Sequence, residues 1–182
     1  RQLSAIVPVV LEQAGFEATY SEGWWDKIIG GTAIYGVFWD GSKLNGLGDI
    51  AVEPVDILNL FWEPGVTKIQ NSANVFHVKL EDNAALEQAY PELSGKLGGN
   101  GLDISKYVYD DTVDTTEKSV VVDWYYKKKQ NKKTVLHYCK FVGETVLYAT
   151  ENNDGEGWYD HGKYPFVFDP MFRVKGTPCG FG

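Results

Sequence analysis

The apolar residues at the start of the chain recur at helical spacing. Leu3 and Ile6 begin this run, which predicts an amphipathic helix over residues 1–14. Pro8 either kinks this helix or lies in its first turn. Gly15 is well placed to end it.

A second helix is predicted to start near Ser21 and to stop at the glycine pair at positions 30 and 31. Its apolar positions are spaced three to four residues apart. The residues that form this stripe, which we expect to be buried, are Trp25, Ile28 and Ile29.

Beyond residue 32 the pattern becomes that of strands. Residues 33–39 form a near-continuous β-prone run that an Asp-Gly turn pair closes. Residues 50–55 alternate like a half-buried strand, in which Pro54 indicates an end, a bulge or a sheet edge. Residues 75–80 alternate again. The residues predicted on one face of this strand are Phe76, Val78 and Leu80.

Residues 82–118 are predicted to form one short helix and one long loop. Asp82 and Asn83 cap the helix, and Pro91 lies at its end. From residue 93 onward the chain is rich in glycine, aspartate and threonine, which indicates a long surface loop.

The most regular segment spans residues 119–150. Three strands of a meander are predicted there, with the sequences SVVVDWYY, TVLHYCKFV and TVLYATEN. Gly143-Glu144 joins the last two, with glycine first as a two-residue hairpin requires. Residues 164–169 form a last short strand. This balance predicts an α+β fold, with N-terminal helices followed by a mainly antiparallel β-sheet.

The elements group into four consecutive segments. Residues 1–32 form an N-terminal helical segment, and residues 33–92 form a β-rich core with a short helix. Residues 93–118 form a flexible loop. Residues 119–182 form a β-meander with a C-terminal strand.

Composition and charge exclude several classes of protein. A chain of 182 residues that is 43% hydrophobic can bury a real core. The formal net charge of −8 argues against a general nucleic-acid binder. No apolar run approaches the roughly 18–20 residues that span a bilayer. Cys139 and Cys179 supply neither a disulfide framework nor a zinc site, which predicts a soluble protein made in a reducing cytoplasm. Because the chain starts at Arg1, without a methionine, we expect a piece of a longer protein.

The three histidines form no recognisable catalytic or metal-binding motif. His77 and His137 are predicted on strand surfaces, and His161 follows Asp160 in a glycine-rich loop. None shows a spacing such as HExxH, and no nucleophile signature accompanies them. We therefore expect no enzymatic activity, no metal and no cofactor. A metal-dependent hydrolase that uses His161 and Asp160 is a third, weaker hypothesis.

Three other features have ordinary explanations. Cys139 shares a predicted strand face with His137 and Phe141, which favours a buried structural thiol. The aspartates at positions 110, 111 and 114 lack the spacing of a calcium loop. Residues 95–101 are rich in glycine but fail the phosphate-loop pattern. The last two features are interpreted as surface loop.

One dense basic patch lies at the predicted tip of the first hairpin of the meander. Its members are Lys127, Lys128, Lys129, Lys132 and Lys133. Lysines neutralise phosphate without reading sequence, so weak contact with DNA or with a partner is one hypothesis. The other is that they keep a long two-stranded ribbon soluble and protect it from edge pairing.

Several blocks in a fixed order carry a resemblance that no single block would carry alone. They are TYSEGWWDKIIGGTAIYGVFWD, GDIAVEPVDILNLFWEPGVTKIQNSANVFHV with ALEQAYPEL just after it, SVVVDWYYKKK followed by TVLHYCKFVGETVLYATEN, DHGKYPFVFD and GTPCGFG. Together, from about residue 3 to the end, they resemble the portal (head–tail connector) proteins of tailed bacteriophages.

The resemblance implies a β-rich wing whose aromatic residues pack and do not react. It implies a structural core made of Val55, Ile57, Leu60, Trp62, Phe76 and Val78. The whole protein would form a dodecameric ring at one capsid vertex, made in the bacterial host cytoplasm and found in the virion. Double-stranded DNA would pass through it, and its partners would be the terminase large subunit, the major capsid and scaffolding proteins and the head–tail adaptor. A helical stem would follow residue 182.

A hypothesis from another class is a carbohydrate- or peptide-binding β-domain. It requires several exposed tryptophans to share one face, because sugar and peptide ligands stack on such platforms. The candidates are Trp39, Trp62, Trp124 and Trp158.

Overall fold

The computed structural model describes residues 2–97, 117–130, 133–153 and 157–182. They fall into two compact units, each assembled from separated stretches of chain. Unit 1 contains Arg1–Ile57, Pro64–Asn71 and Pro165–Gly182, and unit 2 contains Leu58–Glu63 and Ser72–Tyr164. The predicted α+β class, with N-terminal helices and antiparallel sheets, is confirmed. The units differ from the four consecutive segments that the sequence suggested.

Unit 1 begins with two helices, α1 (Gln2–Gln13) and α2 (Phe16–Gly30). Gly15 separates them with a φ of 67°, a left-handed conformation that glycine adopts without strain. The first predicted helix is confirmed, and Pro8 lies inside it rather than in its first turn. The second helix begins at Phe16 rather than near Ser21, because a single residue is enough for the break.

Helix α2 packs on the rest of unit 1 through small and polar residues. Thr19, Gly23 and Lys27, spaced four residues apart, are its buried positions. Thr19 Oγ1 donates a hydrogen bond to the Val52 carbonyl at 3.3 Å. At Gly23 a side chain would overlap the Tyr35 ring. Glycine at this point lets the helix lie close to the sheet.

The apolar stripe predicted to be buried on α2 is exposed, so that prediction is wrong. Trp25 is 67% exposed and Ile29 79% exposed, and Ile28 is exposed as well. The helix carries two stripes of suitable spacing, and the one with Gly23 fits the sheet more closely. The large apolar side chains are therefore turned away from the core of unit 1.

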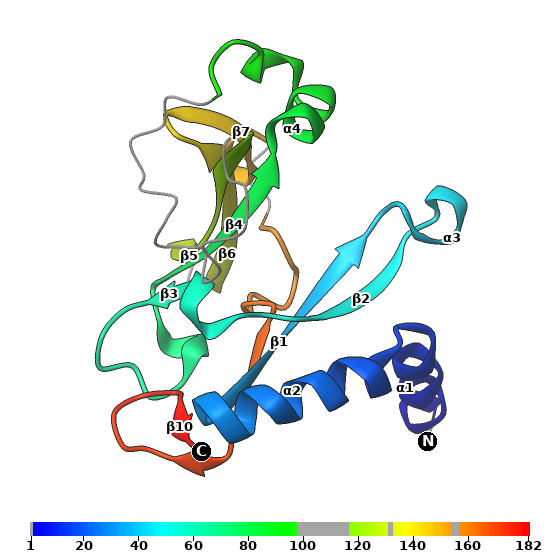
Figure 1. The fold of residues 1–182 in the computed structure, drawn as a ribbon, viewed down its shortest axis with the longest axis vertical. Coiled ribbons are helices and arrows are strands. Elements are labelled where there is room, and N and C mark those ends of the chain that lie inside the picture. The colour runs from blue at the N-terminus through cyan, green and yellow to red at the C-terminus, as the bar shows by residue number, and fades with distance from the viewer. Residues whose placement is uncertain (1, 98–116, 131–132, 154–156) are drawn as a thin grey trace. The chain divides into compact units, whose positions relative to one another are not determined.

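The sheet of unit 1 has three antiparallel strands in the order β2-β1-β8. They are β1 (Thr32–Asp40), β2 (Asp49–Pro54) and β8 (Phe166–Pro170). Figure 1 shows a short turn, labelled α3 (Lys43–Gly46), between β1 and β2. All three strands were predicted, and Pro54 ends β2 as expected. The core beside α2 is built from Ala33, Tyr35, Val52, Phe16 and Ile50.

Short elements complete unit 1. The 3-10 helix η2 (Ile69–Asn71) belongs to the stretch that interrupts unit 2. Strands β9 (Phe172–Arg173) and β10 (Gly180–Phe181) pair antiparallel near the C-terminus. The sequence did not predict this pair, because two-residue strands leave no alternating pattern.

Unit 2 is built on a five-stranded antiparallel sheet in the order β3-β4-β5-β6-β7. The strands are β3 (Leu60–Trp62), β4 (Asn74–Asp82), β5 (Lys118–Gln130), β6 (Lys133–Val142) and β7 (Thr145–Ala149). The predicted meander is confirmed, and Gly143 has the expected positive φ of 55°. The last strand is shorter than predicted, because the 3-10 helix η5 (Thr150–Asn152) replaces its end.

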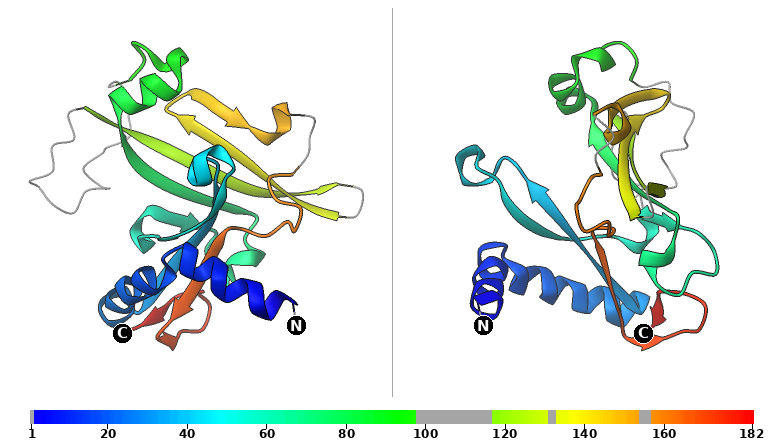
Figure 2. Two further views of the ribbon diagram at one scale, coloured as in Figure 1. Left: turned by 90° about the vertical axis from the view of Figure 1, so that its right-hand side faces the viewer. Right: turned by 180° about the vertical axis from the view of Figure 1, so that it is seen from behind.

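Both faces of this sheet carry apolar residues. On one face Val121 and Val142 pack against Leu86 and Leu93. These leucines come from α4 (Asn83–Ala89) and the 3-10 helix η3 (Pro91–Leu93), and Figure 2 shows α4 at the end of β4. The predicted short helix is thus confirmed. On the other face the cluster is Val78, Val120 and Val122 with Phe76, Leu80 and Phe141.

Three of the six residues expected in the structural core are fully buried. These are Val55, Leu60 and Val78. Ile57, in the 3-10 helix η1 (Ile57–Asn59), is half-buried, as are Trp62 and Phe76. Most of the long predicted loop, including the aspartates at positions 110, 111 and 114, lies outside the described residues.

Candidate functional site

The predicted lysine patch lies within strands rather than in a loop. Lys127, Lys128 and Lys129 end β5, and Lys133 begins β6. Lys132 lies outside the described residues. The strands extend further than predicted because residues 127–130 of β5 pair with residues 133–136 of β6, ending at Gln130 opposite Lys133.

The register divides these lysines between the two faces of the sheet. Residues directly opposite each other in an antiparallel pair point to the same face, and neighbours along a strand point to opposite faces. Lys128 lies opposite Val135 and Lys127 opposite Leu136. Lys128 and Lys133 therefore share one face with Gln130, while Lys127 and Lys129 lie on the other. This division leaves no single basic stripe among the described lysines.

Two of the lysines are held by contacts within unit 2. The Lys127 ammonium lies over the Tyr164 ring, 4.2 Å from its centroid, and burial lowers the pKa of Lys127. Lys128 forms an ion pair with Glu151 and lies 5.4 Å from the centroid of the Tyr126 ring. The hydrogen bond from Lys128 lowers the pKa of Glu151. Both ammonium groups therefore already have an interaction partner within unit 2, an aromatic ring for Lys127 and a carboxylate for Lys128.

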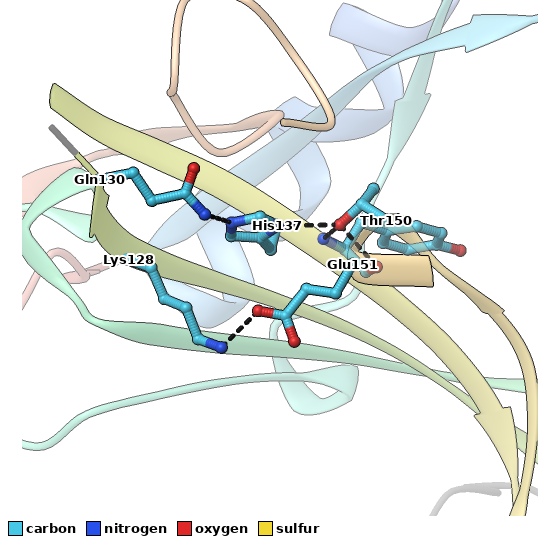
Figure 3. A network of polar contacts seen from close by, with 6 residues as sticks. Lys128, Gln130, His137, Thr150 and Glu151 are labelled. Carbon is cyan, nitrogen blue, oxygen red and sulfur yellow. Dashed lines mark hydrogen bonds and ion pairs between the residues drawn. The ribbon is translucent and has the colours of Figure 1, made fainter. Parts of the chain in front are cut away.

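Next to Lys128 lies a buried polar network centred on His137 (Figure 3). Gln130 Nε2 lies 3.1 Å from His137 Nε2, and Thr150 Oγ1 lies 3.1 Å from His137 Nδ1. An amide nitrogen can only donate, so Nε2 accepts and the proton of a neutral imidazole is on Nδ1. Thr150 Oγ1 also accepts from the Tyr138 amide at 3.0 Å and donates to the Tyr138 carbonyl at 3.3 Å. The imidazole thus anchors η5 to β6.

A second buried polar group, Asp123, lies on the opposite face of the same sheet. Its carboxylate accepts a 2.6 Å hydrogen bond from Tyr138 Oη and lies 3.5 Å from Lys79 Nζ. The residue is 4% exposed. Burial and the Asp123 charge raise the pKa of Tyr138 and of Tyr125. Sequence reasoning missed this acid, because a single aspartate in a valine-rich strand carries no motif.

His77 belongs to the neighbourhood of this acid, since it lies opposite Asp123 in the β4–β5 register. Burial, assisted by the nearby Lys79 charge, lowers the pKa of His77 to about 4, although Asp123 acts in the other direction. His77 is therefore neutral at pH 7. A histidine, an aspartate and a tyrosine come together here, but their burial keeps them from a substrate.

The histidine predictions are partly wrong. His77 is buried and His137 is 0% exposed, whereas both were predicted on strand surfaces. Each points to a face that other elements cover. His161 is exposed, stacks on Tyr159 with ring centroids 5.2 Å apart, and accepts a hydrogen bond from the Lys163 amide at 3.0 Å. Its expected neighbour Asp160 is exposed too.

Cys139 is buried, as predicted. It lies opposite Trp124, on the face that also carries His137 and Phe141. Burial raises the pKa of its thiol, which keeps the thiol protonated and unreactive.

The four tryptophans proposed for a ligand-binding face do not gather on one. Trp39 belongs to unit 1 and is exposed. In unit 2, Trp124 stacks between Phe76 and Tyr126 on one face of the sheet, with centroid distances of 5.8 and 4.3 Å. Trp158 stacks on Tyr138, which lies on the other face, at 4.4 Å. The half-buried Trp62 lies on the same face as Tyr138. This follows from the register, in which Trp62, Val75, Tyr125 and Tyr138 lie opposite one another on successive strands.

Unit 1 carries an exposed helical surface that includes Trp25 and Ile29, two of the three residues predicted to form a buried stripe. One side of α2 carries four residues at intervals of three, one and three positions. We call them the α2 ridge, and they are Glu22, Trp25, Asp26 and Ile29. All four are exposed. The ridge combines two large apolar side chains with two carboxylates.

Unit 1 also has a pocket of about 580 Å³ near the C-terminus. We call it the C-terminal groove. Its apolar lining includes Phe166, Phe168 and Val174, and its charged lining consists of Lys68, Arg173 and Lys175. No motif marked these cations, because they lie in turns and short strands far apart in the sequence.

Among the described residues, no three histidine, cysteine or acidic side chains are grouped so that they could hold a metal ion. Within the same residues, no helix has the length and apolarity to cross a membrane. No family model matches the chain, and no curated protein matches it.

Proposed function

We propose that this chain is a structural component of a phage portal ring at the capsid vertex. In this role it forms part of the assembly through which double-stranded DNA is packaged and ejected and at which head and tail join. The resemblance of the ordered sequence blocks supports the family. The proposal makes the protein a building block without enzymatic activity.

The observation that carries the proposal is the α2 ridge. A helix of an isolated subunit rarely turns a tryptophan and an isoleucine to solvent side by side, and such surfaces mark contact with other proteins. Trp25 and Ile29 are both more than half exposed. Aromatic side chains are enriched in protein interfaces, so the ridge suits a subunit that works within an assembly.

The interior of unit 2 is consistent with a framework role. Two of its buried polar groups, His137 and Asp123, are hydrogen-bonded by side chains of the same unit. Hydrogen-bonded networks of this kind hold one conformation of the core. The net charge of −8 also disfavours adhesion of DNA phosphates as DNA slides past.

The partners follow from the same role. They are other copies of the chain in a ring, dodecameric in this family, together with the terminase large subunit, the major capsid and scaffolding proteins and a head–tail adaptor. Double-stranded DNA is a passing ligand, and the location is the virion after synthesis in the host cytoplasm.

The complete gene product that contains these residues tests the proposal. It should form rings with a central channel in electron micrographs, and antibodies against this chain should label one vertex of the capsid. A product that remains monomeric, or that labels the capsid uniformly, would overturn the assignment.

A further inference from the structure

Among the described residues, no carboxylate forms an ion pair with the charges of the C-terminal groove. Lys68, Arg173 and Lys175 are all exposed at its lining. In a chain with a net charge of −8, three cations beside an apolar depression form a local positive surface. Such a surface fits an anionic partner that also carries apolar side chains.

The α2 ridge has the complementary chemistry. Trp25 and Ile29 supply the apolar part, and Glu22 and Asp26 supply the negative charges. Partial burial and the charges of Asp56 and Glu22 raise the pKa of Asp26. This carboxylate is therefore crowded by like charges, and a cation brought next to it would relieve the repulsion.

The ridge lies on the α2 side of the three-stranded sheet, whereas the groove runs along its edge strand β8, with its aromatic lining on the other side. Tyr35 points toward α2, because its ring fills the space at Gly23. Val167 lies opposite Tyr35 and points to the same side. Its neighbours Phe166 and Phe168, which line the groove, therefore point away from α2.

We propose that the α2 ridge of one copy of this chain docks into the C-terminal groove of a second copy. The inference rests on the assembly role proposed above and names its contact surfaces. Trp25 and Ile29 lie against the apolar lining, and the carboxylates of Glu22 and Asp26 meet Lys68, Arg173 and Lys175. The occupant is thus a helix of the same protein.

The placement on opposite sides determines the symmetry of the contact. In a two-fold dimer, the ridge and the groove of each copy would both have to contact the same partner. Their placement prevents this, so two copies can form only one ridge–groove contact and leave one ridge and one groove unoccupied. Each added copy leaves one ridge and one groove open. The contact therefore extends head to tail, and it closes only as a ring. Because stable interfaces bury more than about 1,000 Å², one such small contact is weak alone, and the test must trap it.

Chemical cross-linking of the 182-residue chain provides the trap. One cysteine replaces Ile29 on the ridge and another replaces Val174 in the groove, in a Cys179→Ser background, and a short bismaleimide joins them. The remaining native thiol, Cys139, is buried. We expect a ladder of dimers, trimers and larger species at high protein concentration. The matched control carries Glu144→Cys in the exposed β6–β7 turn in place of Ile29→Cys, and should give at least fivefold less of the higher species.

Charge reversal then tests the pairing itself. Glu22→Lys with Asp26→Lys should reduce the ladder at least fivefold, and so should Lys68→Glu with Arg173→Glu. Combining all four substitutions should restore it, which a merely structural effect would not do. Circular dichroism of each variant shows whether the fold is kept.

The outcomes separate this inference from the proposed function. Rings of the complete gene product in which positions 29 and 174 fail to cross-link would overturn the ridge–groove contact and leave the portal assignment standing. Cross-linking that stops at dimers would also overturn it. Binding of duplex DNA that Lys68→Glu with Arg173→Glu abolishes, without a ladder, would make the groove a phosphate site and overturn the proposal as well.

Discussion

The Lys27 ammonium lies 2.8 Å from the Asp169 carboxylate and so ties helix α2 to strand β8. The Lys27 side chain is 10% exposed and that of Asp169 36%. A buried cation without its partner is costly, whereas an apolar replacement of the pair can be neutral.

Asp169→Asn should therefore destabilise the chain by about 2 kcal/mol, a value reduced from that of a fully buried pair because Asp169 is partly exposed. Lys27→Met with Asp169→Asn should recover more than half of this loss. Urea unfolding of the parent, the Asp169→Asn and Lys27→Met single variants and the double variant gives the comparison. Additive effects of the two substitutions would mean that the pair contributes nothing.

The hydroxyl of Tyr138 should matter for stability, because it is a hydrogen-bond donor to the buried Asp123. Tyr138→Phe leaves this carboxylate with one partner fewer and should cost about 1–3 kcal/mol. Tyr148→Phe, which changes a half-buried neighbour 5.9 Å away between ring centroids, should stay within about 0.5 kcal/mol of the parent. Equal midpoints of thermal unfolding for the two variants would contradict this reading.

Stability should fall between pH 6.5 and pH 4, because the folded chain depresses the pKa of His77 from 6.5 to about 4. In this window the unfolded state binds the proton more tightly, so acidification favours unfolding. The full contribution of His77 is present above pH 6.5 and is lost as the pH falls toward 4. From pH 7 to pH 5 the loss is about 2 kcal/mol.

His77→Gln should flatten this part of the stability profile. His161→Gln is the matched control, because that histidine is exposed, and its profile should keep the slope of the parent. Urea titrations at several pH values supply the profiles. A slope that persists in His77→Gln would assign the acid sensitivity to another group.

Two adjacent glycines should respond in opposite ways to alanine. Gly31 has a φ of 78°, and a side chain there would overlap the backbone of Phe181, so Gly31→Ala should cost about 2 kcal/mol or more. Gly30 ends α2 and has open space around it. Gly30→Ala should be neutral or stabilising by up to about 1 kcal/mol. Thermal unfolding distinguishes them, and a loss at Gly30 that equals the loss at Gly31 would refute the local geometry.

The lysine patch should bind duplex DNA no tighter than about 1 µM near 0.15 M salt, and the binding should weaken as salt rises. The described lysines are split between two faces, and Lys127 and Lys128 are held by Tyr164 and Glu151. Replacing all five lysines with glutamine tests the patch by fluorescence anisotropy. Submicromolar binding that disappears in this variant would make the patch a functional site.

The strand pattern predicted unit 2 well, because alternating apolar residues and turn residues close in sequence determine which strands pair. Phe76 and Val78 alternate with His77 and Lys79, and Gly143 supplies the turn. The two N-terminal helices were also predictable from spacing. The spacing of apolar residues does not show which of two faces of a helix is buried. In α2 the face with Gly23 is buried, because only glycine leaves room for the Tyr35 ring.

The polar contacts could not be predicted for a related reason. The buried His137 contacts Thr150, which begins η5 directly after the end of β7. The cations of the C-terminal groove come together from separate stretches such as Lys68 and Arg173. Contacts of this kind depend on tertiary structure, and a single sequence holds no pattern for them.

The pairing of Tyr35 with Val167 has a consequence for the order in which the protein forms. Strand β1 emerges from the ribosome well before β8, because the longest stretch of unit 2, Ser72–Tyr164, is made between them. Unit 2 can fold first, because most of it is one continuous stretch, Ser72–Tyr164, and each of its strands pairs with the strand next to it in the sequence. Closing so distant a pair is slow. Until then the edge of β1 that β8 will cover is open to aggregation, so unit 1 should be the part that most needs a chaperone.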